Sequence, residues 1–138
     1  MSRRRFYLDT SFVVGLLNPR DEMHAVARPL YGEVRSAEEV WLTEAVLVEI
    51  GNGLASVDRG RAGAFLEQCY EATNFRVVGV DTNRMRQALR LYRNRGDKGW
   101  GMTDCLSFGV MQEQNLMEAL TADEHFIQAG FRALLLED

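Results

Sequence analysis

The sequence of 138 residues has few cysteines and no long hydrophobic run. Two cysteines are too few for the disulfide framework of a small secreted protein, and Cys69 and Cys105 lack the paired spacing of a zinc site. The longest uninterrupted apolar stretch, Phe12 to Leu17, is far shorter than the roughly 20 residues that a helix needs to cross a bilayer. We therefore expect a cytoplasmic protein with no membrane partner, in which both cysteines are reduced and partly buried.

Proline and lysine are scarce as well. With only two prolines and no repeat or low-complexity tract, no segment is typical of a linker, and we expect a single domain over residues 1–138. Lys98 is the only lysine, so arginine supplies nearly all of the positive charge. The formal net charge of -4 argues against a protein that coats nucleic acid over its whole surface, because such binding needs Lys and Arg facing phosphates.

Short apolar segments alternate with longer segments of helical period, which predicts strands and helices in succession. The predicted strands are residues 6–8, 40–42, 75–80, 119–121 and 131–136. The predicted helices are residues 12–17, 23–37, 45–57, 62–72, 81–95, 104–114 and 123–129. This order predicts an α/β fold, a three-layer α/β/α sandwich in which helices cover both faces of an open, mainly parallel sheet of about five strands.

Four acidic residues are predicted to meet at one edge of this sheet. Asp9 follows the first strand, Asp123 follows the fourth, and Asp104 opens a helix that has Thr103 as its N-cap. Glu49 lies in the apolar start of its helix, residues 45–50, and interrupts a face that would otherwise be buried. Ligands bind outside the carboxyl ends of parallel strands, and grouped carboxylates repel one another unless a divalent cation compensates their charge. Mg²⁺ or Mn²⁺ is the natural partner of such an all-oxygen site.

Each of these four acids also has a purely structural interpretation. Asp9, Asp104 and Asp123 could be caps or first-turn charges at helix N-termini. Glu49 could be a surface residue if its helix is rotated differently. The sequence leaves these alternatives open for any one acid, whereas the combination favours a site. From here on, "the four acids" are Asp9, Glu49, Asp104 and Asp123.

Four ordered segments resemble the PIN-domain family and, within it, the VapC-like toxin ribonucleases of type II toxin-antitoxin systems. These segments are FYLDTS at 6–11, LTEAVLVEI at 42–50, DKGWGMTDC at 97–105 and ALTADEHF at 119–126. The resemblance implies that the four acids are the catalytic, metal-binding residues and that Phe126 is a packing position. It further implies supporting hydroxyls at Thr10, Ser11 and Thr121, and a peripheral contribution from Asp97.

The implied activity is that of a Mg²⁺- or Mn²⁺-dependent endoribonuclease, which hydrolyses RNA phosphodiester bonds and leaves a 5′-phosphate and a 3′-hydroxyl. A toxin of this kind would have a cognate antitoxin as its partner and would form a homodimer. Neither His24 nor His125 is expected to take part in the chemistry, because His125 is placed one turn beyond Asp123 and His24 lies in a helix of ordinary composition.

A dense basic group precedes Asp104 and could guide RNA phosphates toward the acidic centre. It could equally be a solvated helix face, or a surface for an acidic segment of a partner protein. The basic group comprises Arg84, Arg86, Arg90, Arg93, Arg95 and Lys98.

Other α/β proteins with acidic Mg²⁺ sites fit the sequence less well. A receiver domain needs adjacent acids after its first strand and a Lys after its fifth, and a haloacid-dehalogenase-type phosphatase needs Asp-x-Asp where this chain has Asp9-Thr10-Ser11. The alternative from a different class is a non-catalytic PIN-like scaffold that binds RNA or docks proteins. Loss of acids would indicate such a scaffold, and all four acids are present.

Overall fold

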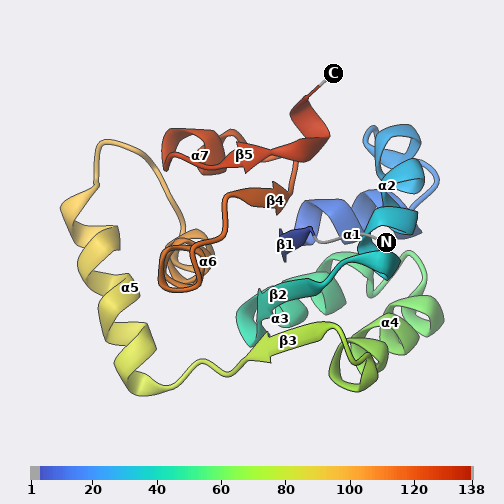
Figure 1. Cartoon of the computed structure of the whole chain (residues 1–138), viewed down its shortest axis with the longest axis horizontal. Coiled ribbons are helices and arrows are strands. Elements are labelled where there is room, and N and C mark those ends of the chain that lie inside the picture. Colours follow the sequence, from blue (N-terminus) through green and yellow to red (C-terminus); the bar gives the residue numbers. More distant parts are fainter. Residues whose placement is uncertain (1–3, 138) are drawn as a thin grey trace.

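The computed structural model describes residues 4–137, and residues 1–3 and 138 lie outside the described part. Its centre is a five-stranded sheet of order β3-β2-β1-β4-β5, in which every neighbouring pair is parallel (Figure 1). The strands are β1 (Arg5–Leu8), β2 (Glu39–Thr43), β3 (Phe75–Val78), β4 (Glu118–Leu120) and β5 (Arg132–Ala133). The predicted α/β class and the parallel sheet are confirmed.

Helices cover both faces of the sheet, as the alternating pattern predicts. They are α1 (Thr10–Leu17), α2 (His24–Ser36), α3 (Glu44–Leu54), α4 (Arg59–Glu71), α5 (Thr82–Asn94), α6 (Met102–Glu113) and α7 (Glu124–Gln128). Successive strand residues point to opposite faces. Phe6 and Leu8 therefore pack with the side chains of α1 to α4, whereas Tyr7 packs with those of α5 to α7. No helix of the described residues is long and apolar enough to cross a membrane.

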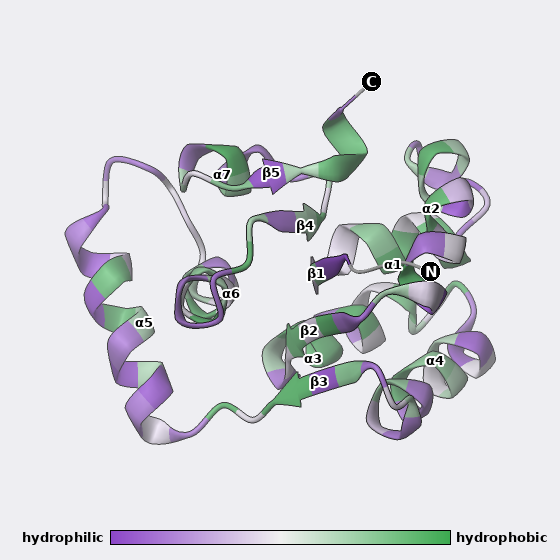
Figure 2. Ribbon diagram, viewed as in Figure 1, coloured by the Kyte–Doolittle hydropathy of each residue, from purple (hydrophilic) through white to green (hydrophobic). Residues whose placement is uncertain are grey.

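Helix α5 is attached to the rest of the molecule along one side. It packs chiefly against α6, and Ala88 is its one buried residue. Figure 2 shows the contrast: α3 and β2 are mainly hydrophobic, whereas α5 is mainly hydrophilic with separate hydrophobic residues along it. Little of α5 is therefore held by the core, and most of its surface faces outward.

Two element boundaries differ from the predictions in an informative way. The predicted strand 131–136 is wrong beyond Ala133, because the chain continues as a 3₁₀ helix over Leu134–Leu136. Leu134 and Leu135 are both buried in the same core cluster, and consecutive strand residues cannot point to the same face.

The start of α6 is also displaced from its predicted position. The helix begins at Met102 with Gly101 as its N-cap, not at Asp104 with Thr103 as the cap. Asp104 is instead the third helical residue, and its Oδ2 accepts a hydrogen bond from the Gly101 backbone N–H at 3.2 Å. A carboxylate at this position reaches back to the N-cap, as the acidic partner of a capping box does.

The order of strands reverses beside β1, which has β2 on one side and β4 on the other. The loops that follow β1 and β4 therefore leave the sheet toward opposite faces and open a crevice between them, the usual ligand position in an open α/β sheet. The two strand ends remain linked, because the Asp9 backbone N–H donates to the Leu120 carbonyl at 3.2 Å.

Candidate functional site

A cleft of about 470 Å³ lies at this reversal of strand order, and all four acids line it. We call it the acidic cleft. Six carboxylates face it, and no Arg or Lys is among its lining residues in the described part of the chain. Besides the four acids, its polar lining residues are Thr10, Ser11, Asp21, Glu22 and His125.

Asp9 is the deepest of the four acids, with only 6% of its surface exposed. It occupies the N-cap position of α1, yet its side chain makes no capping hydrogen bond, so the capping interpretation of Asp9 is wrong. Its Oδ2 instead accepts hydrogen bonds from the hydroxyls of Thr121 at 2.7 Å and Ser11 at 3.4 Å. Burial raises the pKa of Asp9 to about 6, although the Thr121 hydrogen bond acts in the opposite direction.

The hydroxyls around Asp9 form a small network that joins the loops after β1 and β4. The oxygens of Ser11 and Thr121 are 3.1 Å apart, and Thr121 also accepts the Asp123 backbone N–H at 3.0 Å. Ser11 accepts the Ala122 backbone N–H at 2.9 Å. These bonds fix the Asp9 carboxylate relative to Asp123.

Asp104 and Asp123 each have a structural role and a free carboxylate oxygen. Asp104 Oδ2 accepts from Gly101, and Asp123 Oδ1 caps α7 by accepting the His125 backbone N–H at 2.8 Å. The other oxygen of each carboxylate has no hydrogen-bond partner within residues 4–137. Burial raises the pKa of Asp104, and its hydrogen bond with His125 opposes that rise. Capping and ligand binding are therefore compatible for both acids.

Glu49 reaches the acidic cleft from α3 and is exposed. Its Oε1 accepts a hydrogen bond from the Thr10 hydroxyl at 2.9 Å. The helix turns its other face inward, since Val46 and Ile50 are fully buried. Glu49 therefore lies on the exposed side of α3, at the edge of the acidic cleft, and not on the buried face that it was expected to interrupt.

The sequence prediction missed three polar residues of the acidic cleft. The ring of His125 lies 2.9 Å from Asp104 and 3.4 Å from Asp123, because α7 begins directly after Asp123 and places His125 in its first turn. The expected position one turn beyond Asp123 is wrong. Its pKa is raised, chiefly by the hydrogen bond to Asp104. The Asp-x-His spacing at the start of a predicted helix is the sequence feature that could have indicated this position of His125. Asp21 and Glu22 lie between α1 and α2, where the sequence indicated only a loop.

The donor set of the acidic cleft fits a divalent cation. One ligand atom each from Asp104, Asp123 and His125 lie within 4.8 Å of one another, the one such group of His, Cys, Asp and Glu among the described residues. Carboxylate oxygens suit Mg²⁺ and Mn²⁺, whose charge would compensate the repulsion between the acids. A cation would also stabilise the buried Asp9 in its charged form.

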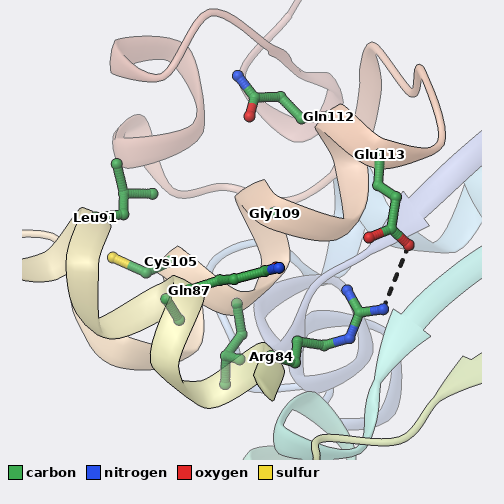
Figure 3. A pocket seen from close by; sticks show the side chains of 9 residues that line it. Arg84, Gln87, Leu91, Cys105, Gly109, Gln112 and Glu113 are labelled. Atoms are coloured by element: carbon green, nitrogen blue, oxygen red, sulfur yellow. Dashed lines mark hydrogen bonds and ion pairs between the residues drawn. The ribbon is translucent and has the colours of Figure 1, made fainter.

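The predicted basic group lies mainly on α5, on the side of the molecule opposite α1 and α2 (Figure 1). Arg84 crosses the groove between α5 and α6 and pairs with Glu113 at 3.3 Å (Figure 3). Arg86, Arg90 and Arg93 are exposed and have no ion pair with any residue from 4 to 137.

Arg95, near the end of the basic group, contacts residues close to it in the sequence. Arg95 pairs with Asp97 at 3.3 Å, and its guanidinium lies over the Trp100 ring at 5.1 Å. Asp97 is exposed and does not line the acidic cleft, and Lys98 is half-buried. The structure therefore does not bring Asp97 together with the four acids.

Both cysteines are free and buried. Burial raises the pKa of Cys69 to about 12 and also raises that of Cys105. A thiol with a raised pKa carries little thiolate near neutral pH, which agrees with the expectation that neither is a nucleophile.

Comparisons with known proteins show the fold and the family of the chain. No curated protein sequence matches the chain. Among solved structures, the toxin VapC20 of Mycobacterium tuberculosis, described as cleaving the sarcin-ricin loop, superimposes with a TM-score of 0.82 at 26% identity, over 92% of this chain and 96% of that one. FitAcB from Neisseria gonorrhoeae shares the fold at a TM-score of 0.59 and 22% identity, over 93% of this chain and 95% of that one. The sequence model of the PIN domain matches residues 6–132, and the chain therefore belongs to the PIN-domain family.

Proposed function

We propose that this protein is an endoribonuclease that uses Mg²⁺ or Mn²⁺ in the acidic cleft to hydrolyse RNA phosphodiester bonds. One observation carries the proposal: side chains from separate parts of the chain bring six carboxylates to a cleft with no Arg or Lys in its lining. Such a cleft repels a phosphate until cations occupy it. Metal ions held by carboxylates can both neutralise a phosphate and activate a water.

The proposed metal ligands come from different elements of the fold. Asp9 and Asp123 follow β1 and β4, Asp104 lies in the first turn of α6, and Glu49 reaches in from α3. The hydroxyls of Ser11 and Thr121 hold the Asp9 carboxylate, so its geometry is set before any ligand binds. A bound metal supplies charge neutralisation and an activated water; the protein side chains supply its position and exclude alternative ligands.

A non-catalytic scaffold is the second candidate function. A buried carboxylate such as Asp9, in a cleft without Arg or Lys, is unfavourable for folding because its hydrogen bonds do not offset the burial of its charge, and a scaffold has no need of it. The oxygens of Asp104 and Asp123 that have no hydrogen-bond partner among residues 4–137 point the same way. These features favour the nuclease.

We further propose that the protein is the toxin of a toxin-antitoxin pair and acts in the cytoplasm. The similarity to VapC20, which is described as a toxin that cleaves the sarcin-ricin loop, supports this assignment. The partner would be a cognate antitoxin. A homodimer is also proposed, and exposed apolar side chains at Met85, Leu89 and Tyr92 give α5 a stripe that a second copy could cover.

The nuclease is tested by incubating the purified protein with a panel of structured RNAs, including a sarcin-ricin loop hairpin, in Mg²⁺, in Mn²⁺ and in EDTA. Cleavage is expected only with metal, and Asp9→Asn and Glu49→Gln should abolish it or reduce it at least about a hundredfold. Glu71→Gln is the matched control, because Glu71 is an exposed carboxylate on α4 outside the cleft. Intact RNA in every condition, together with no metal binding by calorimetry, would favour the scaffold.

A further inference from the structure

His125 is the one lining residue of the acidic cleft that offers a nitrogen donor. Its Nδ1 lies 2.9 Å from Asp104 Oδ2 and 3.4 Å from Asp123 Oδ1. The sequence contains only one other histidine, His24, whose Nδ1 bonds the Gly15 carbonyl at 2.8 Å. Any imidazole signal from a metal in the cleft can therefore be assigned.

The backbone holds His125 in this place. Asp123 caps α7 and accepts the His125 backbone N–H, so the carboxylate and the ring project from the same turn. The Nε2 atom of the ring makes no hydrogen bond to residues 4–137, and 33% of the side-chain surface is exposed. The ring therefore has no other hydrogen bond that a change of its tilt would break.

The distances suit ligands that share one metal ion. Neighbouring ligands of an octahedral ion with bonds of about 2.1 Å are roughly 3 Å apart. Nδ1 stands near that distance from oxygens of two different acids, and the three atoms are mutually close. A ring that served only as a hydrogen-bond donor would need one of these acids, not both.

We propose that His125 is a direct nitrogen ligand of the cation, so that the centre binds Mn²⁺ in preference to Mg²⁺. This inference rests on the proposed function, because it concerns the same metal. Imidazole nitrogen favours transition metals, whereas Mg²⁺ prefers oxygen ligands. To bind the metal through Nδ1, the ring must carry its proton on Nε2. An imidazolium therefore releases its Nδ1 proton to solvent, and a neutral ring that carries its proton on Nδ1 transfers it through solvent to Nε2.

The direct test is pulsed electron paramagnetic resonance of bound Mn²⁺. The His24→Gln variant retains His125 as its only histidine, so ¹⁴N modulation of the Mn²⁺ signal should persist in this variant. Labelling its histidine with ¹⁵N should replace that modulation with the ¹⁵N pattern, and this assignment needs no change at His125. In His125→Gln the modulation should vanish and the Kd for Mn²⁺ should rise at least about tenfold, while the Kd for Mg²⁺ changes less than about threefold.

Two outcomes would overturn the inference, and they differ in what they leave standing. Mn²⁺ that binds the cleft without nitrogen modulation would make His125 a hydrogen-bond partner only, and the proposed nuclease would remain. Binding of neither Mn²⁺ nor Mg²⁺ in wild type, in His24→Gln and in His125→Gln alike would remove the metal centre and the proposed function together.

Discussion

At the scale of single residues, the buried carboxyl of Asp9 makes the stability of the metal-free protein depend on pH. The ordinary pKa of the carboxyl is 3.8, and burial raises it to about 6 in the folded state. Between these pH values the folded protein holds a proton that the unfolded chain has released, so the free energy of unfolding falls as pH rises from about 4 to 6. Above about pH 6, the free energy of unfolding is about 3 kcal/mol lower than near pH 4 on account of this group.

We therefore predict that Asp9→Asn stabilises the protein in EDTA and does so only at higher pH. The gain over wild type should be close to zero near pH 4 and approach about 3 kcal/mol above pH 6, because Asn carries no charge to bury. Urea denaturation at a series of pH values measures it, with Glu71→Gln as the exposed control. A gain that is the same at every pH would contradict the assigned cause.

Thr121 supplies the shortest hydrogen bond to Asp9 and is fully buried. We predict that Thr121→Val lowers the free energy of unfolding by about 1–3 kcal/mol, since it leaves the Asp9 carboxylate and the Asp123 backbone N–H without this partner. Thr121→Ser keeps the hydroxyl and should retain metal affinity, whereas the valine variant should lose it. Calorimetric titration with Mn²⁺ distinguishes the two, and equal affinities would rule out a positioning role.

At the scale of elements, α7 depends on Asp123 for its N-cap, and the same residue lines the acidic cleft. We predict that Asp123→Asn and Asp123→Ala separate these roles. The amide can still cap α7 and should preserve stability, whereas alanine should cost about 1 kcal/mol. Both should weaken Mn²⁺ binding, because both remove the charge. Thermal unfolding in EDTA measures the change in stability, and calorimetric titration measures Mn²⁺ binding. Equal loss of stability in the two variants would contradict the role of Asp123 as a cap.

Helix α5 is the element whose outer face has no role in the fold of one chain. Met85, Leu89 and Tyr92 recur at four- and three-residue spacing and are exposed. We predict that wild type is a dimer by light scattering and that Leu89→Glu is a monomer, because a charge cannot be buried there without a partner. Val57→Glu, at another exposed apolar residue, is the control and should stay dimeric. A dimer in both variants would place the interface elsewhere.

At the scale of the whole molecule, the acidic cleft joins elements from the two ends of the chain. Side chains next to β1 and from α3 meet those of α6 and α7 across it. A cation that binds only the folded protein stabilises it by about 2.7 kcal/mol at a hundredfold excess over its Kd. We predict that Mn²⁺ raises the Tm of wild type by roughly 8 °C under that condition. Asp104→Asn should lose most of this rise, and an equal rise in the variant would argue that Mn²⁺ binds outside the cleft.

Much of the fold follows from local patterns in the sequence. The apolar run at residues 6–8 has the composition of a buried parallel strand, and helical spacing of apolar residues marks α2 and α3. Boundaries were less certain where two local rules compete. Asp104 can act from N3 of a helix as well as from its first residue, and successive leucines at the C-terminal end allow a strand or a 3₁₀ turn.

The sequence by itself placed Asp9 and Asp123 after strands, because residue type and position along the chain suffice to put a carboxylate at the end of a parallel strand. It indicated Glu49 and Asp104 through their helices and the family resemblance, and the packing of α3 and α6 brings these two residues to the same cleft. Only the tertiary structure decided which neighbours complete the site. The position of a loop and the direction of a ring depend on packing between segments distant in sequence, so Asp21, Glu22 and His125 join the cleft without a pattern of their own. The same packing sets α5 apart from α1 and α2 (Figure 1), and charge spacing alone did not show that no residue of the basic group lines the acidic cleft.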